Sequence, residues 1–182
     1  MKQSEIEQLL PEIFRRAVVE GSPLSALLDV MEALHAPSEA ILSEIDRYFD
    51  PYRTPDAFVP YLASWLDLER LLARAPATMN AQTAQTLFPG GLGRLRDLTA
   101  MAVYLSKWRG TTVGLTRFLE TATGVRGFVI EEQVMDESGS PKPFHIRVNA
   151  PKEAASYASL IARIVEQEKP AYVTHEVIFA AD

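Results

Sequence analysis

The sequence predicts an α+β protein, in which a mainly helical N-terminal two-thirds is followed by a small strand-strand-helix-strand module. Apolar residues recur at three- and four-residue steps up to about residue 126, which is the spacing of amphipathic helices. After Gly127 the spacing falls to two, which is typical of half-buried strands. We therefore expect a helical region over residues 1–126, with a long connection at 70–93, and a small α+β module over residues 127–182.

The first fifty residues are expected to form three helices. A stripe of apolar residues over 6–14 predicts the first, and Ser22-Pro23 supplies the cap and first-turn proline of the second. Pro37 should break that second helix, because proline lacks an N–H and clashes with the preceding turn. A third, short helix should end at Asp50-Pro51, because the residue before a proline is disfavoured in the helical region.

Further helices are expected up to residue 124. Thr54-Pro55 should cap the next one, and a short helix should interrupt the connection at 70–93. Residues 94–108 predict a strong helix with two apolar stripes, which implies deep burial or contact with a partner. Arg109-Gly110-Thr111 predicts a helix break followed by a cap. At that junction the Arg109 side chain should bond carbonyls or an acid, and Gly124 should end the last helix.

The C-terminal module is predicted from alternation. Strands are expected near 128–134 and 144–148, joined by turn residues at 136–141. A helix follows over 153–168, and a third strand over 171–179. The module should pack its helix on one face of the sheet.

Composition narrows the class of protein. The chain has 182 residues, with 47% apolar and 23% charged residues, as in ordinary folded domains. Its net charge of −6 argues against a dedicated nucleic-acid binder, and the lack of cysteine excludes disulfides and thiolate chemistry. No apolar run approaches the ~20 residues of a membrane span, and acids stand where a signal peptide has its apolar core. We expect a soluble chain without a direct membrane span.

Charge is unevenly distributed along the chain. Residues 1–50 carry a net charge of −6, residues 51–126 carry +4 and residues 127–182 carry −4. Such a bipolar pattern suits specific docking to other proteins. Ordinary solvated faces explain it equally well.

The sequence predicts no catalytic, cofactor or metal site. By alternation His145 points outward and His175 points toward the core, so they should not ligate one metal. Glu132 falls on the inward face of its strand and is the one acid of interest. Serine-nucleophile motifs are absent, and the glycines at 90–93 follow no strand, as a phosphate-binding loop would require.

Two segments carry a recognisable pattern. Residues 45–66 hold Phe-Asp-Pro at 49–51 and then Pro-x-x-Phe-x-x-x-Leu-Ala-x-Trp-Leu at 55–66. Residues 104–132 hold an Arg-Gly-Thr helix start at 109–111. Together they resemble the phage tail protein I family of contractile-tail baseplates, and the resemblance extends over about residues 5–179, with a departure at 70–93. The motif residues are Asp50, Pro51, Pro55, Phe58, Trp65, Arg109, Gly110 and Thr111.

A structural role explains each type of residue in these motifs. The Asp-Pro and Thr-Pro pairs fix helix ends, and Gly110 allows a close backbone approach or an unusual dihedral angle. Trp65 and Leu66 are expected to be a large buried anchor. None of these roles is catalytic, which agrees with a family of structural proteins.

The resemblance implies a structural, non-enzymatic baseplate wedge protein. Such a protein assembles with two copies of a larger baseplate protein, and six wedges surround a spike hub. Neighbouring wedges, sheath-initiating and spike-hub proteins would be further partners, without nucleic acid, and the chain would relay the contraction trigger. It would assemble in the bacterial cytoplasm and then reside in the baseplate of a phage virion, tail-like bacteriocin or extracellular contractile injection apparatus.

Partner contacts are expected on the N-terminal helices and on the second stripe of the 94–108 helix. These residues could equally belong to the chain's own core. They are Leu9, Ile13, Leu27, Leu28, Met31, Met101, Tyr104 and Trp108.

Two other functions compete with this interpretation. One is a standalone binding or regulatory module, with weak nucleic-acid contacts through Arg94, Arg96, Lys107 and Arg109. The other is a hydrolase built around Glu132 or His175.

Overall fold

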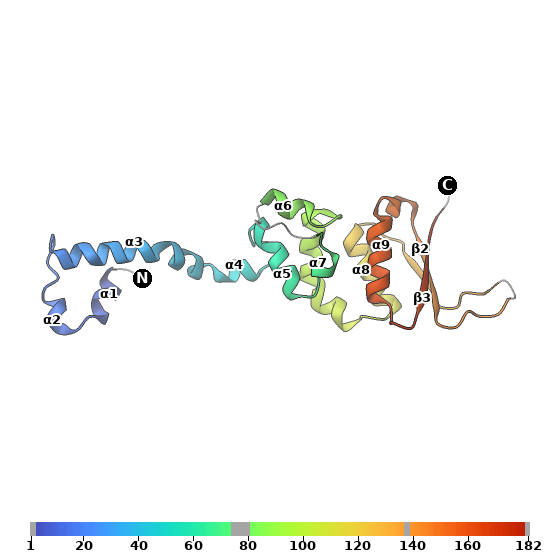
Figure 1. The fold of residues 1–182 in the computed structure, drawn as a ribbon, viewed down its shortest axis with the longest axis horizontal. Helices are drawn as coiled ribbons and strands as arrows, with labels where there is room; N and C mark the ends of the chain where they lie inside the picture. The colour runs from blue at the N-terminus through green and yellow to red at the C-terminus, as the bar shows by residue number, and fades with distance from the viewer. Residues whose placement is uncertain (1–2, 74–80, 137–138, 181–182) are drawn as a thin grey trace. The chain divides into compact units, whose positions relative to one another are not determined.

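The computed structural model describes residues 3–73, 81–136 and 139–180, and it forms two compact units, residues 1–47 and 48–182. Helices fill most of the chain before the strands begin, which confirms the predicted α+β class (Figure 1). The division expected at residue 126 stays a prediction.

The N-terminal unit is a set of helices with a very small core. It contains α1 (Gln3–Leu9), α2 (Glu12–Arg15) and α3 (Pro23–Ser43), followed by the start of α4 (Ile45–Phe49). Ser22 caps α3 as predicted, since its Oγ accepts a hydrogen bond from the Ser25 N–H at 3.1 Å. Among the described apolar side chains of this unit, only Ile6 and Leu28 are fully buried.

The predicted break at Pro37 is wrong, because α3 continues through this residue to Ser43. An internal proline removes one helical hydrogen bond and leaves a carbonyl four residues earlier without its donor. That carbonyl belongs to Ala33, which is exposed, so water can satisfy it. An exposed helix therefore tolerates a proline that a buried helix would not.

The second unit begins with short helical segments and continues with two longer helices. The 3-10 segments are Asp56–Phe58 and Glu69–Leu71, and a third, Lys152–Tyr157, precedes the last helix. The helices are α5 (Val59–Trp65), α6 (Ala81–Thr86), α7 (Gly91–Lys107), α8 (Thr112–Thr123) and α9 (Ala158–Glu168). The short helix expected within 70–93 is α6, while residues 74–80 of that connection lie outside the described residues.

Three strands complete the second unit: β1 (Val129–Glu131), β2 (His145–Ala150) and β3 (Thr174–Phe179). The sheet order is β1-β2-β3, with β1 antiparallel and β3 parallel to β2. The parallel pair is possible because α9 carries the chain back between β2 and β3. The predicted strand-strand-helix-strand order is therefore confirmed.

One core joins the helices to one face of the sheet. α7 packs against α8, and α8 packs against α9 and β1 (Figure 1). Leu95, Leu119 and Ile161 from the three helices are fully buried in a single apolar cluster with Val148 of β2. This shared core fixes the helix ends and turns that hold the polar site described below.

The turn between α7 and α8 depends on two glycines. Gly110 has a φ of +76°, in the left-handed region that glycine adopts without strain. Thr111 then caps α8, because its Oγ1 accepts from the Gly114 N–H at 3.1 Å and donates to the Trp108 carbonyl at 2.7 Å. A Cβ at Gly114 would stand 2.0 Å from that carbonyl oxygen, so the close approach that the sequence assigns to Gly110 occurs at Gly114.

We expect Gly114→Ala to destabilise the protein by about 3 kcal/mol, because the added methyl group collides with backbone that cannot move without shifting the turn. Gly93→Ala is the matched control, since Gly93 lies inside α7 with nothing within 4 Å of its missing Cβ. That variant should be stabilised by about 0.5–1 kcal/mol through helix propensity. Urea unfolding of both variants measures the difference, and equal stabilities would contradict the packing argument.

Candidate functional site

A buried carboxylate lies at the C-terminal end of α9. The Glu168 side chain is only 6% exposed. Its Oε1 forms a hydrogen-bonded ion pair with Arg70, and its Oε2 lies 3.4 Å from Nε of Arg109. Burial of a charged group is costly without such partners, so the two guanidinium groups compensate for the loss of water around this carboxylate.

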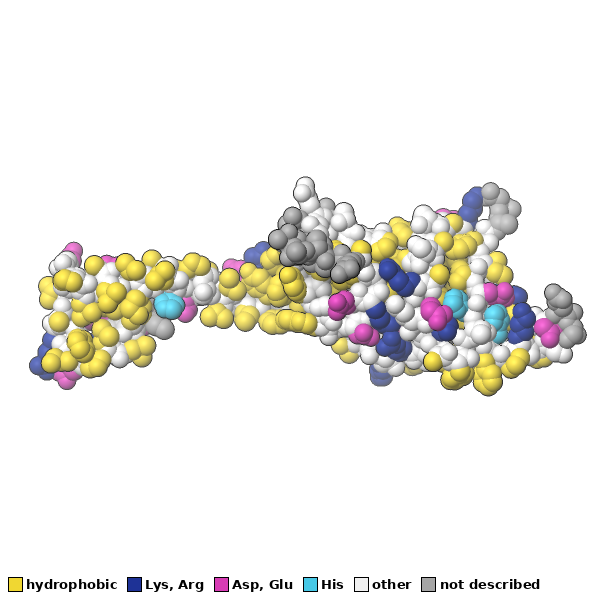
Figure 2. Space-filling model, viewed as in Figure 1, with side chains coloured by type: hydrophobic (Ala, Val, Ile, Leu, Met, Phe, Trp, Pro, Cys, Tyr) yellow, Lys and Arg dark blue, Asp and Glu magenta, His cyan; other side chains and the backbone are white. Residues whose placement is uncertain are grey.

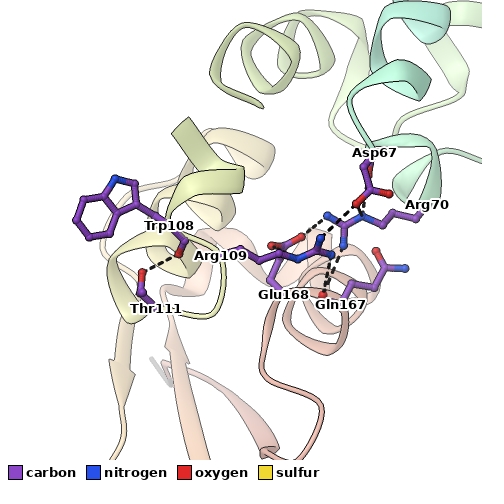
Figure 3. A network of polar contacts seen from close by, with 7 residues as sticks. All are labelled: Asp67, Arg70, Trp108, Arg109, Thr111, Gln167 and Glu168. Carbon is purple, nitrogen blue, oxygen red and sulfur yellow. Dashed lines mark hydrogen bonds and ion pairs between the residues drawn. The ribbon is translucent and has the colours of Figure 1, made fainter. Parts of the chain in front are cut away.

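The same two arginines contact two further groups (Figure 3). Both donate to the Gln167 carbonyl, at 3.5 Å from Arg70 and 3.3 Å from Arg109. Both also approach Asp67 Oδ2, at 3.4 Å and 3.3 Å respectively. We call Asp67, Arg70, Arg109, Gln167 and Glu168 the Glu168 network.

The Glu168 network joins three segments that are distant in sequence. Asp67 and Arg70 follow α5, Arg109 stands in the turn between α7 and α8, and Glu168 ends α9. Asp67 has a φ of +60°, an uncommon backbone conformation for a residue with a side chain. Every charged group of the network is engaged by another member, so the arrangement positions helices and offers no free nucleophile or proton donor.

A third arginine, Arg96, holds the Asp-Pro motif onto α7. Arg96 donates to the Thr54 carbonyl at 2.9 Å, to Asp56 Oδ1 at 2.6 Å and to the Pro51 carbonyl. Its side chain is 15% exposed, so these bonds lie largely out of water. Pro51 therefore bears one of the two carbonyl groups that the Arg96 guanidinium binds, and Pro55 directly follows the residue that bears the other.

The expected helix cap at Thr54 is wrong. Pro55 occupies the cap position of the 3-10 segment that precedes α5, and no side-chain hydrogen bond is formed there. The Thr54 hydroxyl is buried without a described hydrogen-bond partner. The carbonyl of Thr54, captured by Arg96, anchors the residue instead.

The expectation of a buried anchor at Trp65 and Leu66 is also wrong. Trp65 is 64% exposed and Leu66 is 39% exposed. Trp65 lies in a surface cluster with Phe49 and Phe58, at ring-centroid distances of 6.2 Å from each. Exposed aromatic clusters of this kind are typical of binding surfaces, so this motif residue belongs to the surface and not to the core.

The residues expected at partner interfaces are divided between surface and core. Leu28 is buried, so its role is in the small N-terminal core. Leu9, Ile13 and Leu27 are more than half exposed, and Met31 is half-buried. On the second stripe, Met101 is half-buried and Tyr104 and Trp108 are exposed. Their contact with a partner stays a prediction.

The histidines and Glu132 do not converge. His145 contacts Thr174 Oγ1 at 2.8 Å, while His175 lies on the opposite face of the sheet with its Nδ1 3.4 Å from Glu166. β1 ends at Glu131, and Glu132 is exposed, so the expected inward orientation of Glu132 is wrong. Within the described residues no group of three potential ligands could hold a metal ion.

Burial lowers the pKa of His175 below its ordinary value. Glu166 opposes this shift by favouring the charged imidazole, whereas Lys169 and His145 reinforce it. On the other face, the hydrogen bond from Arg147 lowers the pKa of Glu176. His145 lies near both a hydroxyl and an acid, since its Nδ1 contacts Thr174 Oγ1 and its Nε2 lies 3.6 Å from Glu176 Oε1. The Thr174 hydroxyl also donates to the Phe144 carbonyl at 3.2 Å, so these contacts join β2 to β3.

The arginines proposed for nucleic-acid contact are mostly engaged within the chain. Arg96 and Arg109 bind the carbonyls and acids described above, and Arg94 pairs with Asp97 at 3.3 Å. These contacts leave fewer free cations on this surface than the sequence suggested. In the described part of the chain, no helix is both long and apolar enough to cross a membrane.

Comparison with known proteins gives a family match. The model of the family described as phage tail protein (Tail_P2_I) matches residues 22–172, which is most of the chain. The matched range includes all of the Glu168 network and the Asp-Pro and Arg-Gly-Thr motifs. No individually curated protein matches the sequence.

We expect Arg70→Ala to lower the free energy of unfolding by about 3 kcal/mol, because it leaves the buried Glu168 carboxylate short of a partner. Arg109→Ala should cost about 1–2 kcal/mol, since its more exposed side chain is partly replaced by water. Arg117→Ala is the control: its ion pair with Glu120 spans 3.8 Å at the surface and should contribute less than about 0.5 kcal/mol. Chemical denaturation ranks the three variants, and a control as destabilised as Arg70→Ala would contradict this role for the network.

We expect stability to fall as the pH drops from 7 toward 5.5, partly through His175. Its pKa is lower in the folded state, so the unfolded state takes up the proton first, below about pH 6.5. His175→Asn should reduce this pH dependence relative to the unsubstituted protein. Thermal unfolding across this pH range measures the effect, and unchanged pH dependence in His175→Asn would refute it.

Proposed function

Because the chain belongs to the phage tail protein family (Tail_P2_I), and so to the structural components of a tail, we propose that it is a wedge component of a contractile-tail baseplate. In this role it assembles with two copies of a larger baseplate protein around the spike hub. It acts by binding and transmitting movement, without catalysis. The single observation that carries the proposal is the family match, and the architecture of each unit supports it.

The N-terminal unit supports a binding role because it leaves apolar surface uncovered. Leu27, Val30 and Leu34 fall on one face of α3 and are all more than half exposed. Ile41 continues that face, and Figure 2 shows apolar side chains spread over the surface of this unit. An apolar face of this length is typical of a helix that packs against another protein.

Helix energetics lead to the same conclusion. Most of the stability of a protein helix comes from packing of its apolar face. α3 has 21 residues, yet Leu28 is its one buried side chain. A partner that covers the exposed face would supply the missing packing.

The second unit supports the relay of movement. The Glu168 network and Arg96 tie α5, α7, α9 and the loop at 51–56 into one block. A block of this kind moves as a rigid body when its surface is displaced. We infer that it carries displacement from the larger partner to its other neighbours.

Co-expression with the larger baseplate protein tests the proposal. We expect a stable purified complex whose mass corresponds to one copy of this chain and two of the partner. A monomer that does not bind that partner would overturn the wedge assignment.

Paired variants locate the contact. Leu27→Glu with Leu34→Glu should reduce complex recovery at least tenfold, because charges then replace the exposed apolar face of α3. Ala36→Glu adds a charge to the opposite, exposed side of the same helix and should leave recovery unchanged. Circular dichroism of each free chain checks that helix content is kept. Equal recovery from both proteins would exclude this face as the contact.

A further inference from the structure

A shallow groove runs between α7, α8 and the first strand. It has a volume of about 650 Å³ and is lined by apolar and polar side chains, including Met101, Tyr104, Val113, Thr116 and Ile130. Val113 and Tyr104 are 56% and 42% exposed. The groove therefore presents apolar surface that the described chain does not cover.

One side of this groove is an open sheet edge. β1 pairs with β2 and with no other strand of the described sheet. Outside the sheet, no described backbone-to-backbone hydrogen bond involves residues 129–133. The backbone groups of β1 that point away from β2 are therefore free to pair with an added strand. A strand added there would extend the sheet across α8, with alternate side chains directed into the groove.

The two ends of the groove carry opposite charge. At one end, a neighbouring hollow of about 360 Å³ shares Met101 and Arg117 with the groove and adds Arg94 and Arg126. Arg126 is exposed and has no ion pair within the described residues. At the other end, Glu131 and Glu132 line a further hollow that shares Ile130. Glu131 is engaged by Arg147 and Asn149, which leaves Glu132 as the free acid.

Not every cation at the basic end is equally available. Arg94 pairs with Asp97 at 3.3 Å, and Arg117 lies 3.8 Å from Glu120. Glu120 also accepts from the Gly127 N–H at 3.3 Å, so its charge is shared. With three guanidinium groups and two carboxylates, this end keeps an excess of positive charge.

We propose that this groove binds an extended segment of a partner protein, which adds as an antiparallel strand to the free edge of β1. Antiparallel pairing is the more stable arrangement per residue. Because β1 runs from the basic end toward Glu132, the segment would begin with basic residues and end with acidic residues. Small apolar residues between them would face Val113 and Ile130. The inference concerns a different surface from the α3 face and stands whether or not the wedge assignment holds.

A labelled peptide tests the proposal directly. The probe is acetyl-Lys-Lys-Val-Thr-Val-Thr-Glu-Glu-amide, titrated with the full chain and followed by fluorescence anisotropy. The order control has the same composition with the charged ends exchanged, and the backbone control has proline at both threonine positions. We expect at least tenfold weaker binding of each control, because one reverses the charge match and the other removes strand hydrogen bonds.

Protein variants identify the surface. Val113→Arg fills the groove from an exposed position, and Arg117→Glu reverses one charge at the basic end. Each should weaken the peptide at least fivefold, while Lys142→Glu, an equal charge change outside the groove, should not. Hydrogen exchange should show slower exchange of amides within residues 129–133 when the peptide is bound.

Three outcomes would overturn the proposal. They are absence of binding, equal binding of the proline peptide, and unchanged affinity in Val113→Arg. Displacement of the peptide by a single-stranded oligonucleotide at lower concentration than by unlabelled peptide would also overturn it, because the basic end would then be a nucleic-acid site.

Discussion

The buried carboxylate of Glu168 constrains the whole second unit. Burial of a carboxylate is costly unless oppositely charged groups lie beside it. Those groups come from Arg70, 98 residues earlier in the chain, and from Arg109, in the turn between α7 and α8. The helix ends that bear these residues therefore meet at Glu168. The polar cluster thus sets the positions of these helix ends relative to one another. Apolar contacts alone do not set them, because the hydrophobic effect is non-directional.

The two units differ in how much apolar surface they bury. The second unit buries apolar residues from helices and sheet in one cluster. The N-terminal unit buries two apolar side chains among its described residues and leaves most of α3 in contact with solvent. This contrast agrees with a chain whose second unit folds around its own core, while its first unit obtains packing from another protein. Membership of a family of tail proteins fits that contrast, since tail components function inside assemblies.

Features that depend on residues close together in the chain follow from the sequence. They are the order of helices and strands, the caps at Ser22 and Thr111, and the opposite orientations of His145 and His175. The Glu168 network could not be derived in this way. Arg109 was identified as a junction residue, but nothing in the sequence near Glu168 or Asp67 indicates that they share its guanidinium. Trp65 and Pro37 mislead for a related reason. A tryptophan at position 65 suggests a core residue, but its ring is exposed. A proline at position 37 suggests a helix break, but the carbonyl that it leaves without a donor is at the surface, where water can bind it.

The parallel pairing of β2 and β3 has a mechanical consequence. Six residue pairs join these strands, from His145 and Thr174 to Ala150 and Phe179. The chain enters β2 at one end of this pair and leaves β3 at the other. Tension applied between those two points therefore acts along the strands, so the bonds between β2 and β3 share the load and must yield together. In a hairpin pulled at its open end, the bonds would instead break one after another. The pairing of β3 with β2 is thus arranged to resist extension of the chain between these two points.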